Sequence, residues 1–347
     1  MNVRRATTSL LALAGAAFFP AAFPAAAPAA EPVGVVASVK PVHSLVAGVM
    51  QGVAEPMLLV KGAASPHSFS LRPSDARALN RADLVFWIGE DLETFLTKPI
   101  GSLSGKAHVT ALMEAPGVTL LPTREGGAWE PHEASDHEHA QDDHGHGDHG
   151  HGDQDHGHGD HAEGGHGDED GHAHGTRDAH IWLDVANARA MVAAIARELS
   201  EHDSANAARY QANAKALTER LTALDAELGA LLAPVKDRPF VVFHDAYHYL
   251  EDRYGLNAVG AITVSPEQRP SAQRLSEIRG RIAALDAACV FAEPQFEPTL
   301  VATVVEGTGA GKGVLDPLGA GLPDGPDLYF QLMRDMAASL ASCLKAG

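Results

Sequence analysis

Short apolar segments rich in β-branched residues recur along the chain, and longer helix-like stretches separate them. We predict buried strands at 33–39, 57–60 and 84–88 in one series, and at 240–243, 258–264, 289–292 and 313–315 in a second. Helices are predicted between them, at about 41–52, 73–82 and 271–286, and another at about 326–344 ends the chain. Short strands that alternate with helices indicate an α/β fold with mainly parallel sheets, one in each half.

Two helices are predicted between the two series. Asp184 is a suitable N-cap for a helix at 186–201, and a second helix runs from about 205 to 232. The second helix has apolar residues at alternating spacings of four and three, from Tyr210 to Leu231. It would be about 43 Å long. Such a stripe suits a coiled-coil dimer or a single helix that braces two lobes. With a strand series on each side, we expect two α/β lobes joined by one long helix.

The first 30 residues have the composition of a secretory signal peptide. Arg4 and Arg5 form a basic start, an apolar run follows from Leu10 to Phe23, and small residues end the segment at 27–30. A membrane anchor is the alternative, but the short run and its prolines disfavour a spanning helix. No cysteine stands at the expected cleavage point, which disfavours a lipid anchor. We therefore expect the chain to be exported and the segment to be removed near residue 29 or 30.

Much of the acidity of the chain lies in one segment. The formal net charge of the whole chain is −19, and residues 130–178 contain fifteen Asp and Glu against the single Arg177, a net −14. Thirteen of the twenty histidines lie between 132 and 174. Residues 125–178 contain almost nothing apolar, so we predict a disordered loop inserted in the fold. The acidity excludes nucleic-acid binding through phosphate contacts.

These patterns predict the following domain organisation: a signal peptide at 1–30, an N-terminal lobe at 31–184 that contains the 125–178 loop, helices at 185–233, and a C-terminal lobe at 234–347.

The chain has two cysteines, Cys289 and Cys343. Because an exported chain meets an oxidising compartment, we expect them to form a disulfide rather than two buried thiols.

Three histidines outside the loop stand where a predicted strand or the loop ends. His67 follows a predicted strand, and His244 ends the strand at 240–243. His180 opens the segment after the loop, where we predict a strand or its exit at 180–184. Ligands of α/β sheets gather at the carboxyl ends of strands, so these imidazoles can converge in the cleft between the lobes. Three neutral imidazoles suit Zn²⁺, whereas manganese or magnesium would take more carboxylate oxygen. His248, one helical turn after His244, is the weaker candidate.

The chain also resembles a known family over several ordered motifs. The sequence is similar to the ZnuA-like periplasmic solute-binding proteins of bacterial ABC importers. The matching stretches are Ala-Ser-Val-Lys-Pro-Val-His-Ser-Leu at 37–45, Gly-Ala-Ala-Ser-Pro-His-Ser-Phe-Ser-Leu-Arg-Pro-Ser-Asp at 62–75, His-Ile-Trp-Leu-Asp at 180–184, Val-Phe-His-Asp-Ala-Tyr at 242–247, Phe-Ala-Glu-Pro-Gln-Phe at 291–296 and Leu-Asp-Pro-Leu-Gly at 315–319.

This resemblance implies two α/β lobes bridged by a rigid helix, with the metal in the cleft between them. It implies His67, His180 and His244 as metal ligands, and a disulfide between Cys289 and Cys343. Asp316 matches a carboxylate ligand of manganese-binding relatives. Some zinc-binding members have a Glu before the first histidine, where this chain has Pro66, so the fourth ligand is Asp316 or a water.

The implied function is capture of Zn²⁺ in the periplasm and delivery to an ABC permease. The chain has no phosphate-binding Gly-x-x-x-x-Gly-Lys motif, so ATP hydrolysis belongs to a separate chain. We expect a monomer and no enzymatic activity. The alternatives are a manganese or iron receptor of the same fold, a metal-binding adhesin, and a secreted zinc hydrolase. The last is disfavoured because no His-Glu-x-x-His motif is present.

Overall fold

The computed structural model describes residues 33–102, 107–124, 177–263, 270–297 and 299–346. The predicted signal peptide and residues 125–176 of the predicted loop lie outside this described part. Arg177 and Asp178, which the prediction includes in the loop, lie inside it: Arg177 forms an isolated antiparallel bridge with Pro122, and Asp178 is buried. Within the described residues, no helix has both the length and the apolar composition needed to span a membrane.

The first half of the chain builds a parallel four-stranded sheet in the order β2-β1-β3-β4. The register aligns Val36 of the central strand with Met57 on one side and Val85 on the other. The strands are β1 (Val35–Ala37), β2 (Met57–Leu58), β3 (Leu84–Trp87) and β4 (His108–Ala111). The helices of this half are α1 (Lys40–Val49), α2 (Pro73–Leu79), α3 (Thr94–Gly101) and the short 3₁₀ turn η1 (Leu112–Glu114).

The second half repeats this design with the order β6-β5-β7-β8, again all parallel. Phe240 of β5 aligns with Ala258 on one side and Cys289 on the other. The strands are β5 (Pro239–His244), β6 (Asn257–Thr263), β7 (Cys289–Ala292) and β8 (Gly311–Val314). The helices are α6 (His248–Tyr254), α7 (Ala272–Ala284), α8 (Thr299–Val305) and the C-terminal α9 (Leu328–Ala346).

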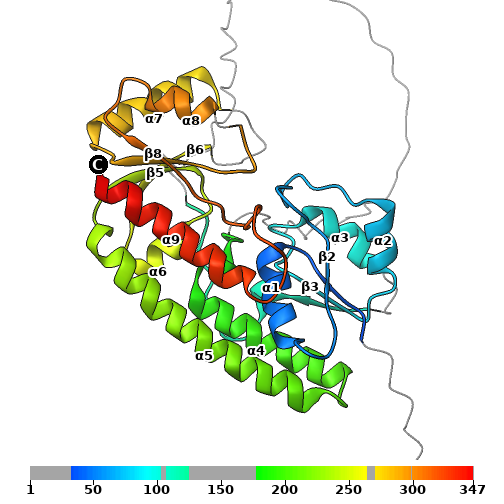
Figure 1. Cartoon of the computed structure of the whole chain (residues 1–347). Helices are drawn as coiled ribbons and strands as arrows, with labels where there is room; N and C mark the ends of the chain where they lie inside the picture. Colours follow the sequence, from blue (N-terminus) through cyan, green and yellow to red (C-terminus); the bar gives the residue numbers. More distant parts are fainter. Residues whose placement is uncertain (1–32, 103–106, 125–176, 264–269, 298, 347) are drawn as a thin grey trace, which may run out of the picture. The chain divides into compact units, whose positions relative to one another are not determined.

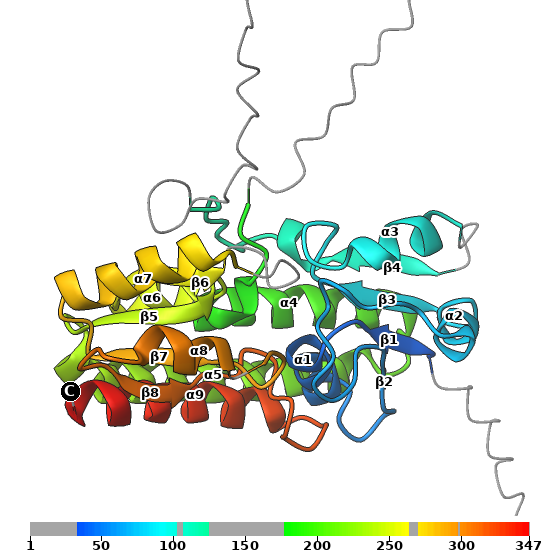
Figure 2. The same ribbon diagram turned by 90° about the horizontal axis from the view of Figure 1, so that it is seen from above.

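The long helix α5 (Ala207–Leu232) runs past both sheets and packs against α1, α4 and α9 (Figures 1 and 2). Its apolar stripe is buried from Tyr210 to Leu232, and the final turn buries Leu232 rather than Leu231. Near its start, Leu217 packs so closely on Gly48 of α1 that a Cβ there would lie 2.9 Å from its side chain. Near its end, Asp225 pairs with Arg253 of α6. The helix therefore braces both halves, the second of the two uses predicted for its stripe.

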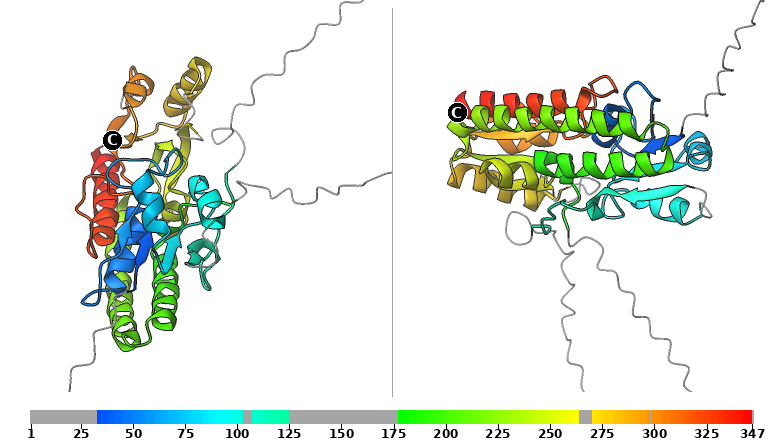
Figure 3. Two further views of the ribbon diagram at one scale, coloured as in Figure 1. Left: turned by 90° about the vertical axis from the view of Figure 1, so that its right-hand side faces the viewer. Right: turned by 90° about the horizontal axis from the view of Figure 1, so that it is seen from below.

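The remaining connections are α4 (Val185–His202) and two 3₁₀ turns, η3 (Ile181–Leu183) and η4 (Ala233–Val235). The predicted N-cap of α4 is confirmed, because the Asp184 side chain accepts a hydrogen bond from the Ala186 N–H at 2.7 Å. A disulfide joins Cys289 of β7 to Cys343 of α9. Figure 3 shows α4, α5 and α9 along one side of the sheets.

Two apolar clusters form the core of residues 33–346. The larger cluster contains residues of both sheets and of the helices along them, and the smaller one lies between the second sheet and α7 and α8. Strand residues of the second sheet divide between the two clusters: Phe240 and Val242 belong to the larger, Val241 and Phe243 to the smaller. Burial on both faces explains why β5 reads as a continuous apolar run. The predicted α/β class, parallel sheets and long helix are confirmed.

Two features differ from the predictions. Residues 180–184 are not a strand or its exit but contain the 3₁₀ turn η3, since a short apolar run does not distinguish a strand from a buried turn. The pattern also missed the short elements α3, β4, α6 and α8 and the 3₁₀ turns η1 and η4. In β4 the cause is exposure: His108 is exposed and the following three residues are half-buried, so the strand lacks the apolar run of its neighbours.

Candidate metal centre

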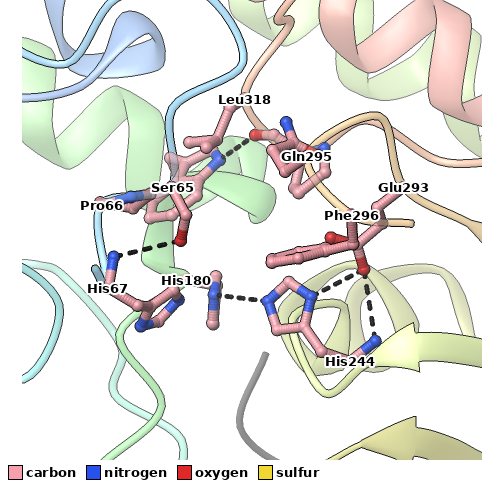
Figure 4. A pocket seen from close by; sticks show the side chains of 11 residues that line it. Ser65, Pro66, His67, His180, His244, Glu293, Gln295, Phe296 and Leu318 are labelled. Carbon is pink, nitrogen blue, oxygen red and sulfur yellow. Dashed lines mark hydrogen bonds and ion pairs between the residues drawn. The ribbon is translucent and has the colours of Figure 1, made fainter. Parts of the chain in front are cut away.

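Three histidines from three separate segments converge in one pocket. His67 lies in the turn segment between β2 and α2, His180 directly precedes η3, and His244 is the last residue of β5. Their ring centroids lie 5.3 to 5.9 Å apart. Figure 4 shows the three rings close to one another. One nitrogen from each residue lies within 4.8 Å of the other two, and in the described part of the chain this is the single group of three with that property.

The spacing of two of these nitrogens matches a zinc site closely. Nε2 of His180 and Nε2 of His244 are 3.4 Å apart. Two nitrogens that each bind Zn²⁺ at 2.0–2.1 Å with a tetrahedral angle would be separated by about 3.3 Å. These two imidazoles therefore need almost no rearrangement to share one tetrahedral ion.

A carboxylate orients His180. Oδ1 of Asp178 lies 2.7 Å from Nδ1 of His180 and also accepts the backbone N–H of His180 at 2.9 Å. A carboxylate only accepts, so Nδ1 of the neutral ring must carry the proton, which leaves the lone pair on Nε2. A carboxylate behind a histidine is a common support for a metal ligand, because it fixes the ring and makes its free nitrogen more basic.

His244 has the same arrangement with a partner from another strand. Oε1 of Glu293, one residue after β7, lies 2.7 Å from Nδ1 of His244. Burial alone would lower the pKa of His244, but the charge and hydrogen bond of Glu293 outweigh it, and the net pKa is raised. The free nitrogen is again Nε2, which Figure 4 shows facing His180.

His67 differs from its two neighbours in its electrostatics. Burial, and then the charges of His180 and His244, lower its pKa well below 6.5. The ring is therefore neutral at neutral pH, and an unprotonated imidazole is the form that binds a metal. The two carboxylates on the other histidines supply negative charge to balance a divalent cation.

Aromatic and apolar side chains line the pocket together with its polar groups. The ring of Trp182 lies 5.3 Å from that of His180, and the ring of Phe296 lies 5.9 Å from that of His244. The Trp182 indole N–H donates to the carbonyl of Pro317 at 2.8 Å, which ties η3 to the segment after β8. The lining residues are Ser65, Pro66, His67, His180, Trp182, His244, Glu293, Gln295, Phe296, Pro317 and Leu318.

Asp316, the fourth predicted ligand, is not brought together with the three histidines. Its Oδ1 accepts the backbone N–H groups of Leu318 at 3.2 Å and Gly319 at 2.9 Å, and its Oδ2 accepts that of Ala320 at 2.6 Å. Oδ1 also accepts Nε2 of Gln295 at 2.9 Å. In this structure the carboxylate therefore closes the turn after β8, and Asp316 as a ligand stays a prediction.

The remaining described histidines lie outside the triad. His43 is buried in α1 and contacts the carbonyl of Pro56 at 3.0 Å. His108 pairs with Glu198 at 2.9 Å, and its ring lies 4.9 Å from that of His202. His248 begins α6 and is not part of the group of three.

A network of charged side chains joins Arg124 to Asp245, the residue after His244, and to Glu251 of α6. Arg124, the last described residue before 125–176, contacts the carboxylates of Asp245 and Glu251. The hydroxyl of Tyr249 donates to the Asp178 carbonyl at 2.7 Å and accepts the Leu121 N–H at 3.0 Å. Both ends of the predicted loop are therefore fastened to the second half of the chain, next to two metal-site segments.

Sequence reasoning found the three histidines but not their supporting residues. Asp178 carried a local signal, since a carboxylate two residues before a candidate ligand can reach its ring. Glu293 and Gln295 belong to the quoted motif at 291–296, but the motif does not reveal which histidine Glu293 supports. That pairing depends on β5 and β7 lying side by side in the sheet.

Comparison with known proteins agrees with this geometry. Residues 35–343 match the family model described as "Zinc-uptake complex component A periplasmic". The chain is 55% identical over 311 residues to the "High-affinity zinc uptake system protein ZnuA" of Brucella abortus (strain 2308), covering 90% of this chain and 91% of the relative.

Two solved structures have the same fold. "Crystal structure of ZnuA" superposes with a TM-score of 0.69 at 23% identity, over 90% of this chain and 100% of that one. "Crystal structure of 138-173 ZnuA deletion mutant plus zinc bound" gives 0.68 at 23% identity, over 90% and 98%. By its sequence match, this chain belongs to the family of periplasmic zinc-uptake complex component A, the ZnuA family.

Proposed function

We propose that the protein is a periplasmic receptor that binds one Zn²⁺ tightly and delivers it to an ABC-type permease. His67, His180 and His244 supply three nitrogen ligands, and an oxygen from Asp316 or a water supplies the fourth. The observation that carries this proposal is the convergence of three ring nitrogens within 4.8 Å, two of them on rings held by buried carboxylates. The Brucella abortus relative, whose name states high-affinity zinc uptake, supports the same function.

The donor set favours zinc over manganese or iron. Imidazole nitrogen suits Zn²⁺, while Mn²⁺ prefers more carboxylate and water oxygen. Asp178 and Glu293 direct an oxygen at Nδ1 of a ring, so they act behind the histidines rather than as ligands. A three-nitrogen site with one oxygen is therefore the arrangement that the described residues support.

The remaining parts of the proposal concern the whole chain. We propose that residues 1–30 are a cleaved signal for export to the periplasm. We propose that the lobes comprise 31–184 and 234–347 with helices 185–233 between them, and that the His-rich residues 125–176 collect weakly bound zinc. The protein acts as a monomeric carrier without catalysis, while the permease and its ATPase are separate chains.

Growth under zinc limitation tests this function. In the source bacterium, deletion of the gene for this chain should prevent growth in chelator-treated medium, and added zinc should restore it. The unaltered chain should also restore growth, whereas His180→Ala should fail and the matched surface variant His202→Ala should succeed. Restoration by His180→Ala, or rescue of the deletion by manganese but not by zinc, would contradict the proposal.

A further inference from the structure

The fourth position of the proposed zinc site has no obvious side-chain ligand. Pro66 precedes His67 and offers no side-chain donor. The Asp316 carboxylate already accepts three backbone N–H groups of its own turn and the amide of Gln295. These four contacts hold both oxygens of Asp316 against its own turn and Gln295.

The side-chain amide of Gln295, one of the residues that line the pocket, has a defined orientation toward Asp316. Its Nε2 donates to Oδ1 of Asp316 at 2.9 Å. A carboxylate cannot donate, so the amide nitrogen must face Asp316, and this contact settles which end of the amide is oxygen. Oε1 is consequently directed away from Asp316.

Oε1 of Gln295 is a buried acceptor that lacks a donor among the described residues. Gln295 also lines the pocket that contains the three histidines. A buried amide oxygen without a partner is unfavourable unless something in the pocket donates to it. A water bound to a divalent cation is a strong donor, because the cation polarises its O–H bonds.

We propose that Gln295 is a positioning residue that holds a water as the fourth ligand of the bound zinc, with Oε1 accepting a hydrogen bond from that water. Asp316 then acts through Gln295, as the carboxylate that orients its amide, and not as a ligand. This inference rests on the proposed function, since it assigns the fourth ligand of that same site. The site holds three protein nitrogens and one exchangeable oxygen, so an incoming ligand can enter without displacing a histidine.

A double-mutant cycle on the full-length protein tests this role. Competitive zinc titration would compare the parent, Gln295→Ala, Asp316→Asn and the double variant. We expect Gln295→Ala to weaken zinc binding about 3- to 10-fold, and Asp316→Asn to add less than 2-fold once Gln295 is absent, because both act through one water. Gln331→Ala is the matched control, since Gln331 forms the same amide–carboxylate contact with Asp335 on the exposed face of α9.

Cobalt-substituted protein gives a second readout that a purely structural role would not change. At half an equivalent of Co²⁺, azide should shift the visible bands of the parent by replacing the water. Less azide should suffice in Gln295→Ala, where the water has lost its partner. His67→Ala gives the signal of cobalt bound elsewhere, which is subtracted.

The outcomes separate the two proposals. A loss of 100-fold or more in Asp316→Asn, whether or not Gln295 is present, would identify Asp316 as a ligand and overturn this inference. Unchanged zinc affinity in Gln295→Ala, or cobalt bands in the parent that ignore azide, would also overturn it. In each case tight zinc binding by the parent that depends on the histidines leaves the receptor function intact, while its absence would refute that function instead.

Discussion

Oε1 of Glu293 lies 2.7 Å from Nδ1 of His244, although 49 residues separate them in the chain. The contact exists because β5 and β7 are neighbours in the second sheet, and each residue stands at or just beyond the carboxyl end of its strand. The strand pairing thus places an anion behind a proposed metal ligand.

Glu293→Gln should weaken zinc binding about 10- to 100-fold, the usual effect of losing the partner behind a metal-binding histidine. The amide can still accept a hydrogen bond but carries no charge to raise the basicity of His244. Competitive zinc titration measures the effect. Glu297→Gln, an exposed change in the segment that follows, is the control and should bind zinc as the parent does. Equal affinity for both variants would show that Glu293 does not support the ligand.

Arg124→Met should destabilise the fold by about 3–5 kcal/mol, because Asp245 and the buried Glu251 lose the cation that both contact. Urea unfolding in the presence of EDTA measures this change. Arg238→Met alters an exposed arginine and should cost little. A variant of Arg124 as stable as the Arg238 control would refute a structural role for this network.

The loss of stability in Arg124→Met should depend on pH. Burial raises the pKa of Glu251 to about 7, against the pull of Arg124, which lowers it. The folded protein therefore holds this proton more tightly than the unfolded chain, so the contribution of Glu251 to stability falls as pH rises from about 4.5 to 7. Without Arg124 the pKa rises further, so the stability deficit of the variant should be larger at pH 8 than at pH 5.5. A deficit that shrinks with rising pH would contradict this assignment.

Loss of the disulfide should cost about 4 kcal/mol in the chain-entropy account, since Cys289 and Cys343 are 54 residues apart. The Cys289→Ser/Cys343→Ser double variant avoids unpaired thiols, and urea unfolding compares it with the parent. The three proposed zinc ligands lie on other segments, so zinc affinity in the folded double variant should stay within about 2-fold. Unchanged stability would mean that the bridge does not constrain the unfolded chain.

The helices and strands that could be predicted were those with a strong local signal. The stripe of α5 predicts its span because seven apolar positions keep one face of a helix, and β5 was found because it is buried on both sides. The short β4 and α8 lack such a signal. Between Ile181 and Leu183 the apolar run was ambiguous, and tertiary packing against Pro317 and α4 selects a 3₁₀ turn.

In the candidate metal site, too, only some residues could be predicted from the sequence. Residue type and chain position pointed to the three histidines, and the family resemblance specified them. The partners Asp178, Glu293 and Gln295 have no signature of their own, because their roles depend on distances across the fold. Asp316 illustrates the limit: the motif leaves Asp316 or a water as the fourth ligand, and the N–H groups of residues 318–320 that its oxygens accept form a turn geometry that composition does not encode.

The central claim is that three histidines hold zinc independently of the His-rich segment. Its most direct test is a competitive zinc titration of the mature protein with residues 125–176 replaced by a short linker, alone and with His67→Ala. We predict one tightly bound zinc in the shortened protein and a loss of at least about 100-fold in affinity when His67 is removed. If the shortened protein binds no zinc tightly, or if His67→Ala binds it unchanged, the three-histidine centre is wrong and the His-rich segment is the metal-binding part of the chain.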